Sequence, residues 1–213
     1  MVRSKNSIQA ADGRTLGARA VHTRTRLLDA TAKLLTENGV LELKIVDISR
    51  EVGTSPATFY QYFIDVEAAI LALIEQATID EIPLVSYLAD GWDGNDGLAR
   101  AGHFVDAYLT YWDDHSAVLR VRNLKAEEGH PAFREARTKA HLLMIDALIQ
   151  MVNSAQTAGR LPAEMNPFVV ASAMLAMIER LFAYRDKIAL RGAGAESLRE
   201  TLALLLYRSL TGR

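Results

Sequence analysis

Cysteine is absent from the 213 residues of the chain. Its absence excludes disulfide bonds, thiol catalysis and cysteine-based zinc sites. Long apolar runs are also missing, since the longest, from Phe168 to Ile178, falls well short of the roughly 20 residues that cross a bilayer. The first residues lack the apolar core of a signal peptide. We therefore expect a cytoplasmic protein that has no membrane partner.

Signatures of catalysis and of metal binding are scarce as well. The sequence contains no HExxH pair, no glycine-rich phosphate loop and no GxSxG motif. Asp113, Asp114 and His115 are consecutive, so we expect them to fan around a solvated helix end rather than to converge on an ion. We therefore expect a protein that is not an enzyme and that uses no metal or other cofactor.

Charge is unevenly distributed along the chain, although its overall composition, 50% hydrophobic and 23% charged, is ordinary for a globular protein. Residues 66–213 carry fifteen basic and nineteen acidic residues. Residues 1–28 carry a single acid, Asp12, and six basic residues, which are Arg3, Lys5, Arg14, Arg19, Arg24 and Arg26. A basic leading segment indicates contact with a polyanion such as DNA, or else a solvated tail whose charge is incidental.

Residues 45–63, IVDISREVGTSPATFYQYF, form the most informative segment. Apolar residues first repeat at helical spacing on one face, at Ile45, Ile48 and Val52. Gly53 follows, where helices commonly end in a left-handed residue. Ser55 offers a capping hydroxyl, and Pro56 stands at the first position of a second helix. Two short helices joined by such a turn are a helix-turn-helix unit, whose second helix can enter the major groove of DNA.

Helical periodicity continues along the rest of the chain, and no segment shows the alternation of a strand. Residues 1–20 contain almost no large apolar side chain and are predicted to be disordered. Asp65 is the expected N-cap of a helix that Pro83 kinks or divides, and a separate helix is expected to begin at Ser116. We expect nine helices: the two short ones, and others over about 22–38, 66–88, 98–114, 116–128, 132–158, 167–190 and 196–210.

The helix-turn-helix segment resembles the TetR family of one-component transcriptional repressors. The matching residues fall at the spacing of that family and are Asp47, Ile48, Gly53, Ser55, Thr58, Phe59, Tyr60, Tyr62, Phe63 and Glu67. Val46, Thr54 and Val66 stand where the family more often has Arg, a small apolar residue and Lys. The resemblance implies an all-α fold in which a three-helix DNA-binding domain precedes a larger helical domain for ligand binding and dimerisation. We expect a disordered basic arm at 1–20, the helix-turn-helix domain at 21–66 and the larger domain at 67–213.

The helix after the turn carries no Lys or Arg, so its DNA contacts would come from hydroxyl, amide and apolar groups. The resemblance implies that base edges are approached by Pro56, Ala57, Thr58 and Tyr60, and the DNA backbone by Gln61 and Tyr62. Ser55 in the turn, and Lys44 at the start of the first of the two short helices, complete the expected DNA-binding set. Gln can read adenine, a methyl group can contact thymine, and hydroxyls can hold phosphates.

Four aromatic rings lie close together in this segment. Phe59 and Phe63 are four residues apart on one helical face, so we expect them in the core of the small domain. We expect Tyr60 and Tyr62 to face DNA, because a small domain cannot bury four rings. The alternative is that both tyrosines are core residues as well.

The second half of the chain carries many aromatic, Met and Leu side chains. Met adapts to irregular space, and Trp and Tyr combine a flat apolar wall with a polar tip. The resemblance implies that some of them line a cavity for a hydrophobic or amphipathic effector, and the alternative is ordinary core packing. The candidates are Phe104, Tyr108, Trp112, Met144, Leu148, Met151, Met174, Met177 and Phe182, with Arg122, Tyr108 or His103 as a polar anchor.

These observations predict a ligand-responsive transcriptional regulator. We expect a repressor that binds a palindromic double-stranded DNA operator as a homodimer and is released by its effector. The resemblance implies a dimer interface built from the last two helices, with a seam supplied by Ala171, Leu175, Ile178, Leu202, Leu206 and Leu210. A small helical carrier of an apolar ligand, without a DNA role, is the alternative. An all-α enzyme would need convergent titratable residues, which the sequence does not offer.

Overall fold

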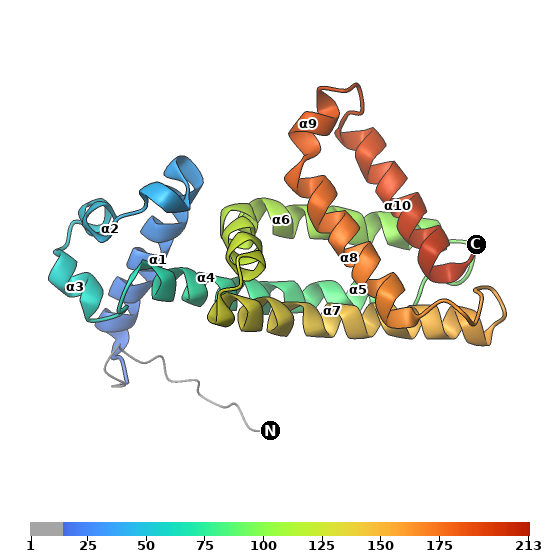
Figure 1. The fold of residues 1–213 in the computed structure, drawn as a ribbon, viewed down its shortest axis with the longest axis horizontal. Coiled ribbons are helices and arrows are strands. Elements are labelled where there is room, and N and C mark those ends of the chain that lie inside the picture. Colours follow the sequence, from blue (N-terminus) through green and yellow to red (C-terminus); the bar gives the residue numbers. More distant parts are fainter. Residues whose placement is uncertain (1–14) are drawn as a thin grey trace. The chain divides into compact units, whose positions relative to one another are not determined.

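The computed structural model describes residues 15–213, and Figure 1 shows their helices in sequence order. These residues contain no β-strand, so the all-α prediction is confirmed. The predicted disordered arm falls largely on residues 1–14, which lie outside the described part. Its last residues, 18–20, are helical, because the first helix begins at Ala18 rather than near His22.

Ten α-helices and two 3₁₀ turns make up the described chain. The helices are α1 (Ala18–Asn38), α2 (Ile45–Val52), α3 (Pro56–Tyr60), α4 (Val66–Glu81), α5 (Ser86–Ala89), α6 (Gly97–Glu127), α7 (Pro131–Thr157), α8 (Pro167–Ala183), α9 (Arg185–Ala189) and α10 (Ala195–Thr211). The 3₁₀ turns are η1 (Val40–Glu42) and η2 (Ile82–Val85). When α4, η2 and α5 are counted as one interrupted helix, residues 15–213 form nine helices, which is the predicted number, although two of the predicted boundaries differ.

The predicted start of the α4 segment is confirmed. Asp65 caps α4, since its Oδ1 accepts a hydrogen bond from the Ala68 N–H at 2.7 Å. The α-helix ends at Glu81, and Pro83 lies in the 3₁₀ turn that separates α4 from α5. Proline has no N–H and its ring crowds the preceding turn, which explains the interruption.

Two predicted helix boundaries are wrong. α6 runs unbroken past Ser116, because serine in a helix interior costs only a fraction of a kcal/mol, about 0.5, and the flanking Trp112 and Leu119 are both buried. Asp113, Asp114 and His115 therefore lie inside a helix, not at its solvated end. At the other boundary, α8 stops at Ala183, where Tyr184 leaves helical geometry with φ −112° and ψ 8°, and α9 follows as a separate turn.

The chain folds as two compact units. The first takes in the chain up to Gln76 together with Ala117–Ala136, and the second contains Ala77–Ser116 together with Arg137–Arg213. Three helices, α4, α6 and α7, therefore contribute residues to both units. The expected functional boundary at residue 66 stays a prediction.

Each unit has an apolar interior. Buried side chains from α1 to α4 and from the ends of α6 and α7 form the core of the first unit, among them Leu27, Ile48, Phe59, Ile70 and Phe133. The interior of the second unit contains a cluster of aromatic rings, in which the ring centroid of Tyr108 lies 5.9 Å from that of Phe104 and 6.1 Å from that of Phe182. Over residues 15–213, no helix is both long and apolar enough to cross a membrane.

Candidate nucleic-acid interface

The turn between α2 and α3 is fixed by Gly53. Its φ of 71° and ψ of 38° lie in the left-handed region, which glycine adopts without steric penalty. The Gly53 N–H donates to the carbonyls of Arg50 and Ser49, and the Thr54 N–H donates to the Ser49 carbonyl at 2.9 Å. These bonds satisfy carbonyls that would otherwise be unpaired at the end of α2, and they reverse the chain sharply.

Ser55 and Pro56 then start α3 immediately after the turn. The Ser55 Oγ accepts a hydrogen bond from the Thr58 N–H at 3.3 Å, and Pro56 occupies the first helical position. The Ser55 hydroxyl is therefore partly committed to capping, while the residue itself is exposed. The predicted helix-turn-helix is thus present, with both of its predicted stop and start signals in place.

The rings of this segment separate into an inner and an outer set. Phe59 is fully buried and Phe63 nearly so, with their ring centroids 5.5 Å apart, which confirms the predicted core pair. Tyr60 is 52% exposed, so it lies on the outer side of α3. Tyr62 is half-buried and packs against the core of the first unit, so packing takes up part of its ring.

The remaining candidates surround Tyr60 on the surface. Pro56, Ala57 and Gln61 are exposed, and Thr58 is half-buried. Positions 56, 57, 60 and 61 are one helical turn apart in pairs, so they share one side of α3. Lys44 is exposed at the N-cap position of α2. This outer surface offers methyl, phenol, amide and ammonium groups, which suit contacts to base edges and phosphates.

Two arginines of the basic leading segment make contacts within the first unit. The Arg24 guanidinium lies 5.0 Å from the centroid of the Phe63 ring, and burial lowers the pKa of Arg24 while the Glu75 carboxylate raises it. Arg26 Nη2 donates to the Val52 carbonyl at the end of α2, at 2.7 Å. Both side chains therefore stabilise the first unit, a role that a count of charges along the sequence does not reveal.

Two charged features of the first unit have no place in the sequence-based predictions. Arg50, in the last turn of α2, forms an ion pair with Asp47 at 2.7 Å, yet 72% of its side chain is exposed beside the turn. Its position three residues from Asp47 is the only sequence signal for this pair. Glu67 on α4 meets Lys125 and His130 from the α6–α7 end, a grouping that joins distant parts of the sequence.

Most of the predicted effector-binding residues are core residues in this structure. Phe104, Tyr108, Trp112, Met144, Leu148 and Phe182 are at most 1% exposed, and Met174 and Met177 are half-buried. All of these belong to the second unit, whereas Arg122, the predicted polar anchor, is buried in the first. Arg122 Nε donates to Asn123 Oδ1 at 3.1 Å. Within residues 15–213, the Trp112 Nε1–H is buried without a hydrogen-bond acceptor.

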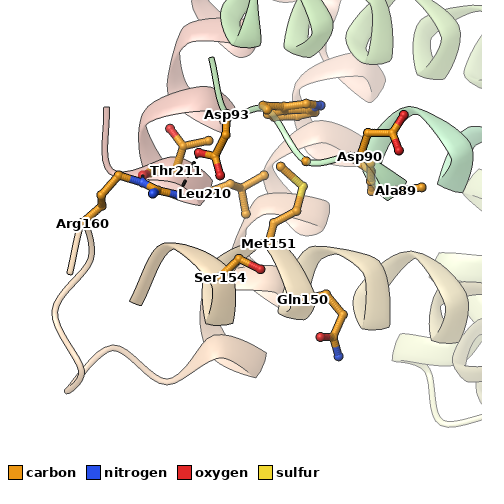
Figure 2. Close-up of a pocket in the computed structure, with 12 residues that line it drawn as sticks. Ala89, Asp90, Asp93, Gln150, Met151, Ser154, Arg160, Leu210 and Thr211 are labelled. Atoms are coloured by element: carbon orange, nitrogen blue, oxygen red, sulfur yellow. Dashed lines mark hydrogen bonds and ion pairs between the residues drawn. The ribbon is translucent and has the colours of Figure 1, made fainter. Parts of the chain in front are cut away.

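Met151 lines a cavity of about 180 Å³ at one end of the second unit. Figure 2 shows Arg160, Asp93 and Thr211 together on one side of this cavity and Asp90 on the other, with Met151 between them. On its side of the cavity Arg160 donates two hydrogen bonds, from Nη2 to Asp93 Oδ1 at 2.7 Å and from Nε to the Thr211 carbonyl at 2.9 Å. The other predicted effector residues do not line this cavity.

The predicted dimer seam is wrong in its residues. Ala171, Leu175, Ile178, Leu202, Leu206 and Leu210 are each at most 2% exposed within a single chain, so they pack against their own unit. α8 and α10 contact each other, as Figure 1 also shows. Their exposed apolar side chains are instead Phe168, Val169, Leu204 and Leu205.

Comparisons with known proteins agree with this arrangement. Residues 27–73 match the family model of bacterial regulatory proteins, tetR family, and residues 85–213 match that of the tetracyclin repressor-like C-terminal domain. HTH-type transcriptional regulator UidR from Escherichia coli (strain K12) is 24% identical over 195 residues, which cover 88% of this chain and 94% of UidR. HTH-type transcriptional regulator EthR from Mycolicibacterium smegmatis is 22% identical over 87% of this chain and 85% of EthR.

Solved structures show the same fold. Salmonella enterica GusR superposes with a TM-score of 0.65 at 22% identity, over 89% of this chain and 96% of GusR. The transcriptional regulator FadR from Bacillus subtilis, in complex with stearoyl-CoA, superposes with a TM-score of 0.65 at 12% identity, over 89% of this chain and 98% of FadR. The family matches cover the helix-turn-helix and most of the second unit. The chain therefore belongs to the TetR family of transcriptional regulators.

Proposed function

We propose that this regulator is a cytoplasmic repressor that binds a palindromic operator as a homodimer and is released by a small hydrophobic or amphipathic effector. The observation that carries the DNA-binding part is the division of α3 into two sides. Phe59 is fully buried on the inner side, while Tyr60 is 52% exposed on the outer side among other exposed candidates. A short, well-capped helix with a free outer side suits insertion into the major groove.

The proposed DNA contacts follow from the exposure of each group. Pro56, Ala57, Thr58 and Tyr60 are assigned to base edges, and Gln61, Tyr62, Ser55 and Lys44 to the DNA backbone. Ser55 can do so only through the part of its hydroxyl that does not cap α3, and Tyr62 only through its outer edge. Backbone contacts set the register on the duplex, so specificity is assigned to the first group.

A homodimer is proposed because two-fold operators are read by two recognition helices about one DNA turn apart. The exposed apolar side chains Val169 of α8 and Leu204 and Leu205 of α10 supply an apolar face for a second copy. Large exposed apolar side chains gathered on two contacting helices are typical of an interface.

Release by an effector is proposed as a population shift. Effector bound in the second unit would favour a conformation whose recognition helices no longer match the half-site spacing. α4, α6 and α7 contribute to both units and are the covalent route for this coupling. A coupling of about 1–3 kcal/mol would lower operator affinity about 5–150-fold. The stearoyl-CoA bound to the similar FadR supports an effector with an apolar part.

The effector is assigned to the aromatic and Met cluster of the second unit, which requires that cluster to open on binding. Its members are Phe104, Tyr108, Trp112, Met144, Leu148, Met151, Met174, Met177 and Phe182, with Tyr108 as the polar group, since Arg122 lies in the first unit. The buried Trp112 Nε1–H, which has no acceptor among residues 15–213, is available for a polar atom of the effector.

Selection of bound sequences from random duplex DNA tests the DNA-binding proposal. A palindromic sequence should emerge, and its affinity should fall with salt by about 0.9 log units per log unit for each phosphate contacted. Removing residues 1–14 should reduce that slope if Arg3, Lys5 or Arg14 contacts phosphate. Failure to enrich any sequence would support the alternative of a helical carrier without a DNA role.

A further inference from the structure

A groove runs between α7 and α8 in the second unit. It encloses about 300 Å³, which lies at the lower end of the range for small-molecule sites. Residues about one turn apart on α7, namely Arg137, His141 and Ile145, line one wall, and Phe168, Ser172 and Glu179 of α8 line the other. None of the residues assigned above to effector or DNA binding lines this groove.

The two ends of the groove differ in polarity. His141 and Glu179 meet at one end, where Nε2 of the histidine lies 3.2 Å from Oε1 of the glutamate. α7 ends and α8 begins at the loop that joins them (Figure 1). Ile145 is nearer to this loop than His141 along α7, and the 60% exposed Phe168 is nearer to it than Glu179 along α8. Both therefore lie toward the opposite, apolar end. At 1.5 Å per residue, Arg137 and Ile145 are about 12 Å apart along α7. The groove is therefore amphipathic along its length.

The charged side chains at the polar end differ in whether they already have a partner. Glu179 is only 9% exposed and is already paired with His141. Arg137 is half-buried, and its guanidinium forms no hydrogen bond or ion pair with any residue between 15 and 213. An arginine at the end of an apolar groove, without a counter-ion, favours an anionic group there. Its planar guanidinium matches a carboxylate, which can accept two parallel hydrogen bonds.

We propose that the α7–α8 groove binds an amphipathic monocarboxylate, with its carboxylate on Arg137 and its apolar chain along Ile145 and Phe168. This site is separate from the buried aromatic cluster, and the proposal does not rest on the proposed function, because binding can be measured without DNA. A helix from a second copy is the competing occupant, since Phe168 also belongs to the exposed face of α8.

Isothermal titration calorimetry on the full chain tests the proposal with three probes of equal chain length: octanoate and octylamine below their micelle concentrations, and 1-octanol below its solubility limit. Octanoate should bind about tenfold or more tightly than 1-octanol, as expected for one added charge-assisted hydrogen-bonded pair. Arg137→Gln should remove that difference and leave 1-octanol unchanged, whereas Arg137→Lys should retain part of it. Lys139→Gln removes the same charge from a neighbouring exposed site on α7 that does not line the groove, and it should change nothing.

The apolar end has its own test. Phe168→Ala should weaken octanoate and 1-octanol by the same factor, because it removes contact with the chain and not with the carboxylate. Glu179→Gln should tighten octanoate, since it removes a negative charge near the bound carboxylate. Thermal melts of each variant show that it is folded.

Three results would overturn the proposal. The first is no measurable heat with octanoate, and the second is tighter binding of octylamine, which would assign the site to a cation at Glu179. The third is an equal effect of Arg137→Gln and Lys139→Gln on octanoate. Sedimentation velocity separates the competing occupant: a loss of dimer in Phe168→Ala, together with absent octanoate binding, would show that a second copy covers the groove.

Discussion

The ammonium of Lys125 on α6 lies 3.0 Å from Oε1 of Glu67 in the first turn of α4. The second carboxylate oxygen of Glu67 lies 3.1 Å from His130 Nε2, in the turn between α6 and α7. The His130 ring meets Phe133 edge to face at 5.0 Å, and Phe133 is fully buried in the core of the first unit. Glu67 therefore links α4, the helix that follows the helix-turn-helix, to the end of α6 and to the turn between α6 and α7.

The contribution of the Glu67–Lys125 pair should appear in the pH dependence of the stability of the chain. The hydrogen bond from Lys125 lowers the pKa of Glu67 below its ordinary value of 4.5, and the pKa of Lys125 is raised by the same bond. A carboxylate with a lowered pKa stabilises the fold above its ordinary pKa, and the contribution is lost as the pH falls through the lowered value. Because 40% of the Glu67 side chain is exposed, the contribution should stay below about 1 kcal/mol.

Glu67→Gln is the corresponding test. Urea unfolding of the variant should show a shallower loss of stability than the parent chain as the pH falls from about 6 to about 3. Lys125→Met should reduce part of this acid-induced loss of stability, since His130 remains beside the carboxylate. If the parent chain and Glu67→Gln lose the same stability as the pH falls, the pair makes no net contribution.

Tyr60 and Phe59 should respond oppositely to truncation. Tyr60→Ala should cost operator affinity about 1–3 kcal/mol, because it removes a proposed DNA contact, and it should leave the melting temperature nearly unchanged. Phe59→Ala should destabilise the first unit by about 3–5 kcal/mol, because it empties a buried site. Tyr87→Ala is the matched control, since Tyr87 is 43% exposed in the second unit. Equal destabilisation by Tyr60→Ala and Phe59→Ala would contradict the division of α3 into two sides.

Local signals explain why so much of the helix-turn-helix follows from the sequence. Gly53, Ser55, Pro56 and Asp65 act on neighbours within a few residues, and each holds the turn or cap that its residue type predicts. Ser116 shows the limit of the same reasoning, because a possible cap is not used when burial of Trp112 and Leu119 favours an unbroken helix. A start signal therefore identifies a helix end only where no stronger packing demand opposes it.

Non-local contacts explain what the sequence leaves open. Periodicity identifies Leu202 and Leu206 as an apolar face, but it does not distinguish the chain's own core from a second copy. The charge count treats Arg24 and Arg26 as available cations, although both make contacts within the first unit. The Glu67 contacts join residues about 60 positions apart, beyond the reach of helical spacing.

Gly53 should be intolerant of a side chain for conformational reasons alone. Its φ is +71°, and an added Cβ would meet nothing within 4 Å, so Gly53→Ala should cost about 1–2 kcal/mol through backbone strain only. Gly102, inside α6, is the matched control, because its Cβ would meet Arg199 Nη2 at an ordinary 3.5 Å. Gly102→Ala should stabilise the chain by about 0.5–1 kcal/mol. Chemical denaturation of both variants measures the two signs, and a neutral Gly53→Ala would contradict the strained turn.

Two adjacent leucines of α10 separate a dimer interface from the interior of one chain. Leu205 is 43% exposed, so Leu205→Glu should change the stability of the folded chain by less than about 0.5 kcal/mol while it places a charge in the proposed interface. Leu206 is fully buried, so Leu206→Ala should cost about 2–5 kcal/mol of stability.

Sedimentation velocity and chemical denaturation together read out both leucine variants. We expect Leu205→Glu to shift dimer to monomer and to weaken operator binding, because a single recognition helix reads only one half-site. Leu206→Ala should unfold earlier and, while folded, keep the oligomeric state of the parent chain. A Leu205→Glu variant that remains dimeric would place the interface away from the exposed side of α10, and the exposed Leu204 and Leu205 would then be ordinary surface residues.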